Sequence, residues 1–451
     1  MHLGNVRTAL FNFLLARATG GRFLLRMEDT DAERSTESAG QAILDDLRWL
    51  GLVWDEGPQA DGAAGPYRQS QRSRVYDEHL TRLTESGHAY PCWRTERELS
   101  EFRRRCLAAR RPPVYDRDWA RLPEDEIRRR EAAGQKPVIR FRVPDTGILD
   151  FEDCVRGPQH FDLTGIGDFV VRRSDGTPAF FFSNAVDDAL MGVTHVLRGE
   201  DHLSNTPRQI LLLRAADLPV PVYGHLPLLL GEDGKPLSKR LGSAGMGEFR
   251  DTGLFPLALA NYAARLGHAF DSGELMPLDV LADHFSLDRI GVAPARFDPV
   301  QLEHWQGLAV LAADDAALAE WAGEQSFLAV PPELRARFLA CVRPNVHRPA
   351  DVEGWADILF GKGPAFTREA ETVLAETGHE FFRVALDGLE SGDKSLGAVS
   401  GFIKTHLGLR GRALFRPLRL ALTGVEAGPE LALIVDLIPV ETLKSRLARW
   451  A

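Results

Sequence analysis

Two short stretches of the sequence carry side chains that suit the binding of phosphate. The string HLGN at residues 2–5 begins an expected helix, where unpaired backbone N–H groups and partial positive charge favour an anion. The string KPLSKR at residues 235–240 is a basic loop whose lysines could neutralise charge that develops on transferring phosphates. Taken alone, the first is also typical of an accidental helix start and the second of a solvated basic turn.

The elements around these stretches indicate a parallel sheet. Residues 4–19 have the apolar spacing of a buried helical stripe, and residues 22–27 form a predicted strand before a second helix. Another strand is expected over 194–198, followed by a helix that Thr206 would cap, and a further strand over 226–230. Alternation of helix and strand is typical of an α/β domain.

A basic segment interrupts this rhythm. Residues 94–142 contain 15 basic and nine acidic side chains, a local charge of +6 in a chain of −10. Segments 138–143 and 168–182, with a turn at 174–177, have the β-rich pattern of an inserted domain. Beyond about residue 245 helical periodicity dominates, which predicts an all-helical C-terminal half.

Composition narrows the class of protein. A chain of 451 residues with 44% hydrophobic residues is long enough for about three domains, and its net charge of −10 excludes a wholly basic coat for nucleic acid. The four cysteines form no C-x-x-C pair, so they predict reduced thiols in a cytoplasmic protein. No run approaches the ~18 apolar residues of a membrane span, and no membrane partner is expected.

Six strings along the chain closely resemble the glutamyl-tRNA synthetases, a family of class I aminoacyl-tRNA synthetases. They occur in the family's order and cover essentially all residues: HLGNVRTALFNFLLAR, RFLLRMEDTD, GPYRQSQR, VDDALMGVTHVLRGEDHLSNTPRQILL, GHLPLLLGEDGKPLSKR and FRPLRLALTG. The resemblance implies a Rossmann-like class I catalytic domain (1–90 and 180–243) with an inserted α+β acceptor-stem-binding domain (91–179). A helical stem-contact domain (244–305) and an all-α anticodon-binding domain (306–451) would follow.

The resemblance also implies the reaction and the ATP site. Glutamate and ATP would form glutamyl-adenylate, and the glutamyl group would pass to the 3′ end of tRNA. The ATP-binding residues would be His2, Gly4, Asn5, Leu228, Ser238, Lys239 and Arg240, because HLGN matches the HIGH signature and PLSKR the KMSKS loop. His2 and Lys239 would be catalytic, with Lys239 stabilising the transition-state charge, and Mg²⁺ would accompany ATP.

Glutamate needs a cation for its side-chain carboxylate and an anion for its ammonium group. In the family pattern Arg198 would grip the carboxylate with two hydrogen bonds and Glu28 would take the ammonium. Phe180, Asn184 and Asp201 line the same implied pocket. The alternative interpretations are a surface salt bridge for Arg198 and a helix-capping role for Glu28.

The implied macromolecular partner is tRNA-Glu, tRNA-Gln or both, bound by a monomer. Arg103 and Arg104 would contact the acceptor stem, and Arg416 and Arg419 the anticodon. Alternatively, Arg103 and Arg104 lie on a solvated helical face, and Arg416 and Arg419 have structural roles.

The sequence departs from the family pattern at several positions. Relatives have a strand before the HIGH histidine that this sequence does not contain; we interpret the start as an internal methionine, and the alternative is a chain that lacks part of the site. Phe180 stands where many relatives have tyrosine, and Pro236 replaces the first lysine of the KMSKS loop beside Lys235. Only Cys92 and Tyr115 remain of a zinc knuckle, so no structural zinc is predicted.

Three other functions stay open at this stage. A paralogue that glutamylates the queuosine of tRNA-Asp would lack the region past about residue 310, and a glutaminyl-tRNA synthetase would have a β-barrel anticodon region. A tRNA-binding paralogue with impaired catalysis is the alternative from a different class.

Overall fold

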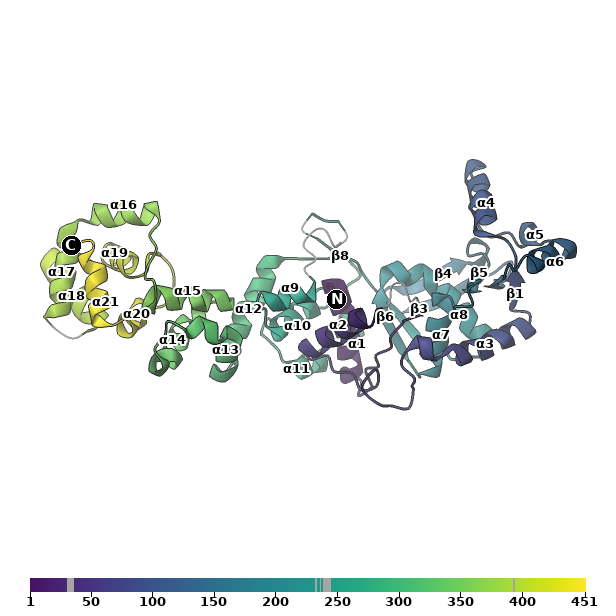
Figure 1. Cartoon of the computed structure of the whole chain (residues 1–451), viewed down its shortest axis with the longest axis horizontal. Coiled ribbons are helices and arrows are strands. Elements are labelled where there is room, and N and C mark those ends of the chain that lie inside the picture. The colour runs from purple at the N-terminus through teal and green to yellow at the C-terminus, as the bar shows by residue number, and fades with distance from the viewer. Residues whose placement is uncertain (31–35, 232, 236, 238–244, 392–393) are drawn as a thin grey trace. The chain divides into compact units, whose positions relative to one another are not determined.

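A computed structural model of the chain describes residues 1–30, 36–231, 233–235, 237, 245–391 and 394–451. The chain divides into two compact units (Figure 1): unit 1 comprises Met1–Met246 and Ala260–Asp298, and unit 2 comprises Gly247–Leu259 and Pro299–Ala451. Pro236, Ser238, Lys239 and Arg240 of the predicted KMSKS loop lie outside the described residues. Within the described ranges, no helix combines the length and the apolar character needed to cross a bilayer.

The main sheet of unit 1 has four strands in the order β4-β3-β7-β6. Its strands β6 and β7 run parallel, β3 joins β7 in parallel, and β3 and β4 form an antiparallel hairpin. The parallel α/β core expected from the sequence is therefore confirmed, and a hairpin from the predicted inserted segment extends it. The bounds are β3 (Ile148–Asp153), β4 (Gly157–Asp162), β6 (His195–Gly199) and β7 (Val222–Leu226).

Helix α1 (Leu3–Ala18) packs against β6. Its apolar stripe, including Val6, Leu10 and Leu14, is fully buried, and Gly20 ends the segment with a positive φ of 66° that suits glycine. Asn12 fixes the helix to the strand, because its side-chain amide donates to the carbonyl of Leu197 at 2.9 Å. The predicted helix and its end are confirmed.

Two predicted strands differ from the structure. Residues 22–27 form only isolated parallel bridges, at Leu24 and Met27, instead of a continuous ladder. The strand expected over 226–230 is divided: β7 ends at Leu226 because Pro227 has no N–H to donate, and β8 (Leu229–Leu230) then pairs with β9 (Ala295–Arg296).

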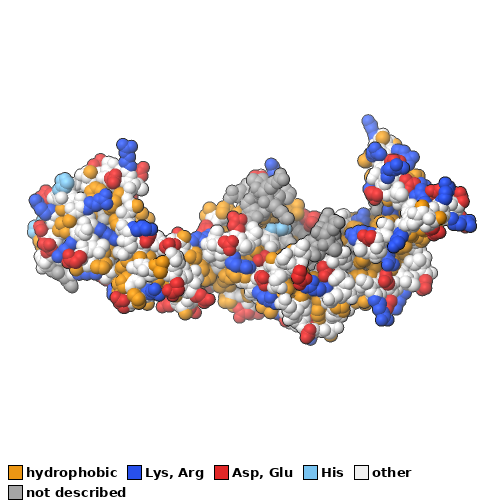
Figure 2. Space-filling model, in the orientation of Figure 1, with side chains coloured by type: hydrophobic (Ala, Val, Ile, Leu, Met, Phe, Trp, Pro, Cys, Tyr) orange, Lys and Arg blue, Asp and Glu red, His pale blue; other side chains and the backbone are white. Residues whose placement is uncertain are grey.

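The inserted segment contains a three-stranded antiparallel sheet in the order β1-β2-β5. The predicted turn at 174–177 is confirmed: the N–H of Arg173 donates to the carbonyl of Thr177, and Gly176 has a φ of 94°. Residues 180–182, expected to be β-rich, instead begin helix α7. Figure 2 shows basic side chains over the neighbouring helices. The bounds are β1 (Ala89–Cys92), β2 (Val138–Phe141), β5 (Phe169–Arg172), α4 (Glu96–Ala108), α5 (Arg117–Ala120) and α6 (Glu124–Ala132).

Further helices complete unit 1 and lead into unit 2. In unit 1 these are α2 (Glu37–Trp49), α3 (Ser73–Glu85), α7 (Phe180–Leu190), α8 (Thr206–Ala215) and α11 (Leu278–Asp283), with a 3₁₀ segment, η3 (Glu200–Asn205), before α8. Two helices cross the boundary between the units, α9 (Met246–Asp251) and α10 (Pro256–Arg265).

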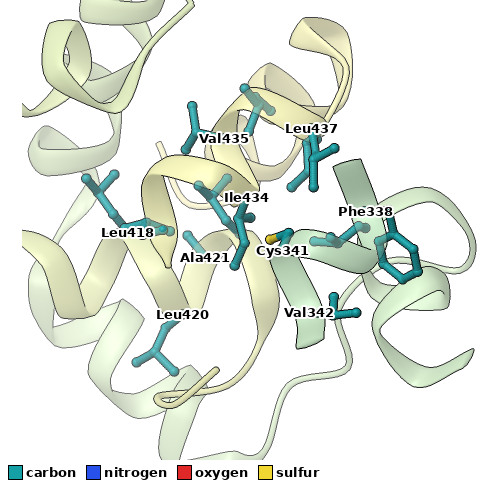
Figure 3. Close-up of a cluster of buried hydrophobic side chains, with 14 of the residues drawn as sticks. Phe338, Cys341, Val342, Leu418, Leu420, Ala421, Ile434, Val435 and Leu437 are labelled. Atoms are coloured by element: carbon teal, nitrogen blue, oxygen red, sulfur yellow. The ribbon is translucent and has the colours of Figure 1, made fainter. Parts of the chain in front are cut away.

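The described part of unit 2 is helical, as the sequence predicts for this half. Figure 3 shows buried side chains of α14 (Phe338, Cys341), α19 (Leu418, Ala421) and α20 (Ile434) packed into one core. The bounds are α12 (Pro299–Ala312), α13 (Asp315–Ala322), α14 (Arg335–Val342), α15 (Pro349–Phe360), α16 (Arg368–Thr377), α17 (His379–Glu390), α18 (Leu396–Leu407), α19 (Arg412–Thr423), α20 (Leu431–Leu437) and α21 (Val440–Ala448). The finer domain boundaries within both units stay predictions.

Candidate active site

The carboxyl ends of β6 and β7 hold a pair of facing side chains. Arg198 on β6 and His225 on β7 are register partners in the parallel ladder, each one residue before the end of its strand. Side chains at one register position of adjacent strands share a face of the sheet. Ligands of open α/β sheets bind at this edge, so the structure puts Arg198 where a ligand is expected.

The guanidinium of Arg198 is held by neutral groups. Its Nε donates to His225 Nε2 at 3.2 Å, its Nη2 donates to Thr206 Oγ1 at 2.7 Å, and its carbon lies 5.0 Å from the centre of the Tyr223 ring. No carboxylate of the described residues forms an ion pair with it, so the alternative salt bridge is not observed there. Burial lowers the pKa of Arg198. A largely buried cation without an anionic partner is suited to receive one from a ligand.

Thr206 has a different role from the predicted one. The sequence suggests that it caps a helix, but α8 begins at Thr206 itself, after Asn205, without a side-chain cap. Its hydroxyl is instead 3.0 Å from His225 Nε2 and accepts the hydrogen bond from Arg198. The helix cap expected at Thr206 is wrong because this hydroxyl is buried in the network around Arg198.

Glu28 and Asn184 are brought together as predicted glutamate-binding residues. Asn184 donates from Nδ2 to Glu28 Oε1 at 2.7 Å, and its Oδ1 accepts from Gln209 at 2.7 Å. Arg26 also donates to Glu28, at 3.1 Å. Gln209 stands three residues after Thr206 on the same face of α8, so one helix connects this carboxylate with the Arg198 network. No helix-capping bond of Glu28 is present among the described residues.

A buried carboxylate on α7 fixes the segment that carries Asn184. Asp187 is fully buried and accepts hydrogen bonds from Tyr76 at 2.7 Å, Gln69 at 2.9 Å and Arg72 at 2.7 Å. The sequence gives no local signal for this cluster, because Asp187 lies more than 100 residues from each of its three partners. It sets the orientation of α7 and therefore of Asn184.

Phe180 and Asp201 both lie beside His202. The rings of Phe180 and His202 are 5.7 Å apart, and His202 Nε2 is 3.7 Å from Asp201 Oδ2. Burial is the main cause that lowers the pKa of His202. Asp201 is exposed and makes no hydrogen bond to Arg198 in the described structure. His202 is a site neighbour that the sequence analysis missed.

The predicted ATP residues that the structure describes belong to α1 and to the β7–β8 connection. His2 is the exposed N-cap of α1, and its Nδ1 accepts from the N–H of Asn5 at 3.4 Å. A Cβ at Gly4 would lie 3.1 Å from the imidazole of His2, so a larger residue there would require the exposed His2 side chain to shift by a few tenths of an ångström. The N–H of Leu228 donates to Glu200 at 2.8 Å. Ser238, Lys239 and Arg240 lie outside the described residues.

Buried Arg7 connects these two parts of the predicted ATP site. It stands on α1 and donates to the carbonyls of Pro227 and Leu266. Burial lowers its pKa to about 10. Arg7 is a further neighbour of the predicted ATP site that the sequence reasoning did not identify.

The two remaining members of the zinc knuckle contact one another. The Tyr115 hydroxyl donates to Cys92 Sγ at 3.0 Å, and the Arg140 guanidinium lies 4.0 Å from the centre of the Tyr115 ring. Within the described ranges, no three His, Cys, Asp or Glu side chains are grouped so that they could hold a metal ion.

The predicted tRNA-binding arginines fall into two groups. Arg103 and Arg104 are exposed on α4, where Arg103 pairs with Glu96 at 3.1 Å. On α19, Arg416 is ion-paired with Glu426, and Arg419 donates to the carbonyl of Pro429 at 2.9 Å. Burial lowers the pKa of Arg419. The α4 arginines present more of their charge to solvent than the α19 pair.

Comparisons with known proteins agree on one family. Residues 1–304 match the family model for the catalytic domain of class I tRNA synthetases specific for E and Q. The chain is 52% identical to glutamate–tRNA ligase 2 of Alkalilimnicola ehrlichii, over 99% of this chain and 94% of that protein, and 51% identical to glutamate–tRNA ligase 2 of Nitrosococcus oceani, over 99% and 95%.

Solved structures give the same result. A crystal structure of a glutamate tRNA ligase from Elizabethkingia meningosepticum in complex with its amino acid has a TM-score of 0.89 and 28% identity, covering 100% of this chain and 96% of that one. Glutamate-tRNA synthetase from Elizabethkingia anophelis also has a TM-score of 0.89 at 28% identity, covering 100% and 97%.

Proposed function

The chain belongs to the glutamyl-tRNA synthetases, which are ATP-dependent class I ligases, and from this premise we propose how it selects and transfers its amino acid. It activates L-glutamate with ATP to glutamyl-adenylate, releases pyrophosphate, and transfers the glutamyl group to the 3′ end of tRNA-Glu. A second acceptor would be tRNA-Gln.

The observation that carries this proposal is the state of Arg198. It is a guanidinium with neutral hydrogen-bond partners at the carboxyl end of β6, and no carboxylate of the described residues is paired with it. The side-chain carboxylate of glutamate supplies the missing anion with two charge-assisted hydrogen bonds. Glu28 takes the ammonium group, and Asn184 orients Glu28 through the 2.7 Å hydrogen bond between them. Phe180 and Asp201 complete the pocket next to His202.

The ATP site is proposed at the start of α1 and the connection after β7. The N-terminal N–H groups of α1, with His2, Gly4 and Asn5, bind phosphate oxygens, and the backbone carbonyl of Leu228, whose N–H donates to Glu200, binds the nucleotide. Lys239 and Arg240 supply positive charge as the α-carboxylate of glutamate attacks the α-phosphate, and Ser238 contributes a neutral hydroxyl beside them. Mg²⁺ arrives with the ATP phosphates. No residue of the protein has to form a covalent intermediate.

For tRNA we propose contact with the exposed arginines of α4, including Arg103 and Arg104, and with the α19 region that contains Arg416 and Arg419. We also propose that the protein works as a monomer in the cytoplasm without structural zinc. The Tyr115–Cys92 hydrogen bond supports the last point, because the thiol already has a partner that is not a metal.

Exchange of pyrophosphate into ATP tests the activation step. The assay contains glutamate and, in parallel, either purified tRNA-Glu, purified tRNA-Gln or no tRNA. We expect glutamate-dependent exchange with tRNA-Glu, followed by charging of that tRNA. Absence of exchange under all three conditions would leave a tRNA-binding protein without catalysis. A fourth reaction contains purified tRNA-Asp, and transfer of glutamate to that tRNA alone would favour the queuosine-modifying reaction.

A further inference from the structure

A buried carboxylate–imidazole pair lies directly behind Arg198. Asp153, the last residue of β3, is 1% exposed, and His225 on β7 is fully buried. Their side chains make a short hydrogen bond between Asp153 Oδ2 and His225 Nδ1. The two residues are 72 positions apart in the chain, and neither has a role in the function proposed so far.

The carboxylate of Asp153 is fixed by the backbone around it. Oδ1 accepts the N–H groups of Val155 at 3.0 Å, Arg156 at 2.9 Å and His225 at 3.2 Å. Burial opposes ionisation of this carboxyl, but the hydrogen bonds from His225 and the backbone outweigh it and hold its pKa below the ordinary value. Asp153 is therefore an anionic acceptor in one orientation.

This acceptor determines which ring nitrogen of His225 carries the proton. Nδ1 must donate to Asp153, so Nε2 is left with a lone pair. The group that faces Nε2 is Nε of Arg198, which can only donate, at 3.2 Å. Thr206 closes the arrangement, since its oxygen accepts from Arg198 Nη2 and its hydroxyl lies 3.0 Å from the same His225 nitrogen.

Nε and Nη2 each give one hydrogen bond to the protein, so Nη1 and the second N–H of Nη2 remain for a carboxylate. Nη1 of Arg198 has no partner among the described residues, and it is not one of the buried unpaired atoms, so it is in contact with solvent. The outer edge of the guanidinium therefore has one fixed orientation when a carboxylate pairs with it. The carboxylate of Asp153 makes no ion pair with the arginine: it attracts the guanidinium from a distance, and its hydrogen-bonded connection to Arg198 runs through the imidazole.

We propose that Asp153 and His225 form a positioning relay that presents the guanidinium of Arg198 to the side-chain carboxylate of the amino acid substrate. The proposal rests on the proposed function of Arg198 and adds two residues that set its orientation. The relay also determines specificity, because a misoriented guanidinium pairs less well with a carboxylate.

Two substitutions of His225 separate positioning from structural support. An asparagine amide matches Nδ1, so His225→Asn keeps the bond to Asp153 and removes the acceptor for Arg198. A glutamine amide matches Nε2, so His225→Gln keeps the acceptor and removes the bond to Asp153. We expect KM for glutamate to rise about tenfold in His225→Asn and less in His225→Gln, with KM for ATP and kcat at saturating glutamate unchanged. The reverse ranking would overturn the relay.

Asp153→Asn tests the same inference from the other end of the relay. The amide oxygen of the new asparagine still accepts the backbone N–H groups, but its NH₂ group now faces Nδ1 of His225. Nδ1 must then accept a hydrogen bond, so the imidazole proton moves to Nε2. The N–H at Nε2 and the Nε–H of Arg198 are then two donors that face one another. We expect a rise of about tenfold in KM for glutamate in a protein that stays folded at the assay temperature, with a lower melting temperature because a stabilising buried carboxylate is lost. If Asp153→Asn folds and has the wild-type KM for glutamate, the relay is refuted. This test is valid even if both His225 variants fail to fold.

The same hairpin offers a matched control. Asp150 and His160 form an exposed carboxylate–imidazole pair at 2.7 Å on β3 and β4, and Asp150→Asn should leave KM for glutamate unchanged. Arg198→Ala distinguishes the two proposals. If it leaves KM for glutamate unchanged, the proposed glutamate site is wrong; if it raises KM while Asp153→Asn does not, only the relay is wrong.

Discussion

Removal of the Arg198 guanidinium is the strongest test of the proposed glutamate site. In Arg198→Ala the substrate carboxylate loses two charge-assisted hydrogen bonds, each worth about 1.5–3 kcal/mol. The expected loss is about 3–6 kcal/mol, or roughly 10²–10⁴-fold in kcat/KM for glutamate. The preference for glutamate over glutamine should disappear at the same time, because the variant has no cation that distinguishes a carboxylate from an amide.

The structure indicates that this loss is not a folding defect. His225 and Thr206, the two partners that Arg198 leaves behind, already lie 3.0 Å apart and can hydrogen-bond to one another. The substitution also removes a buried cation, whose pKa burial lowers. We therefore expect the melting temperature of Arg198→Ala to stay close to that of the wild type.

The assay is pyrophosphate exchange with tRNA present, titrated with glutamate and then with glutamine. Arg265→Ala is a suitable control, because Arg265 is a half-buried arginine that donates to the carbonyls of Ser272 and Glu274 at 3.1 and 2.9 Å. It should lower the melting temperature and leave KM for glutamate unchanged. An Arg198→Ala protein that is folded and uses glutamate as the wild type does would refute the assignment.

Three further predictions follow from other residues. Lys239→Ala should slow adenylate formation by about 3 kcal/mol, or about 10²-fold in exchange, and an unchanged rate would exclude its charge-stabilising role. In the wild type, Asn184 donates a hydrogen bond to Glu28 at 2.7 Å, and in Asn184→Asp two carboxylates face one another there instead. KM for glutamate should therefore rise about tenfold by steady-state kinetics. A wild-type value would contradict the proposed pocket. Burial lowers the pKa of His268 to about 4 from an ordinary 6.5, so between these pH values the unfolded chain binds more protons than the folded one. The free energy of unfolding therefore falls as the pH decreases from 6.5 to 4, by up to about 3 kcal/mol. His268→Gln should flatten this dependence in melting curves recorded across that range, and an unaltered slope would assign it to other groups.

The parts of the fold that the sequence predicted well are those set by local rules. Helix α1 follows from apolar periodicity and ends at Gly20, and the turn at 174–177 follows from its Asp-Gly pair. The strand over 226–230 was placed less well, since apolar composition continues past Pro227 while the ladder of β7 stops at Leu226. Residues 22–27 have strand-like composition, but the number of bridges they form depends on distant neighbours.

The candidate site shows the same division between local and distant information. Arg198 could be assigned because its motif is contiguous and the chemistry of glutamate requires a cation. Asp153 and His225 could not, because a single carboxylate and a single histidine 72 positions apart carry no spacing signal. Thr206 was misassigned for a related reason: its place before a predicted helix suggests a cap, whereas its actual partner is selected by tertiary packing.

The neutrality of the groups that hold Arg198 has a consequence for selectivity. A protein carboxylate paired with this guanidinium would have to be displaced by the substrate, and much of the binding energy would be lost in the exchange. With His225 and Thr206 as partners, the arginine keeps its orientation and has no carboxylate hydrogen-bonded to it until the substrate binds, although Asp188, Asp153 and Asp201 attract its charge from a distance. Glutamine would leave that charge buried and unpaired, which is unfavourable by more than the loss of one hydrogen bond. Discrimination against glutamine therefore follows from the lack of a competing anion as much as from the contacts with glutamate.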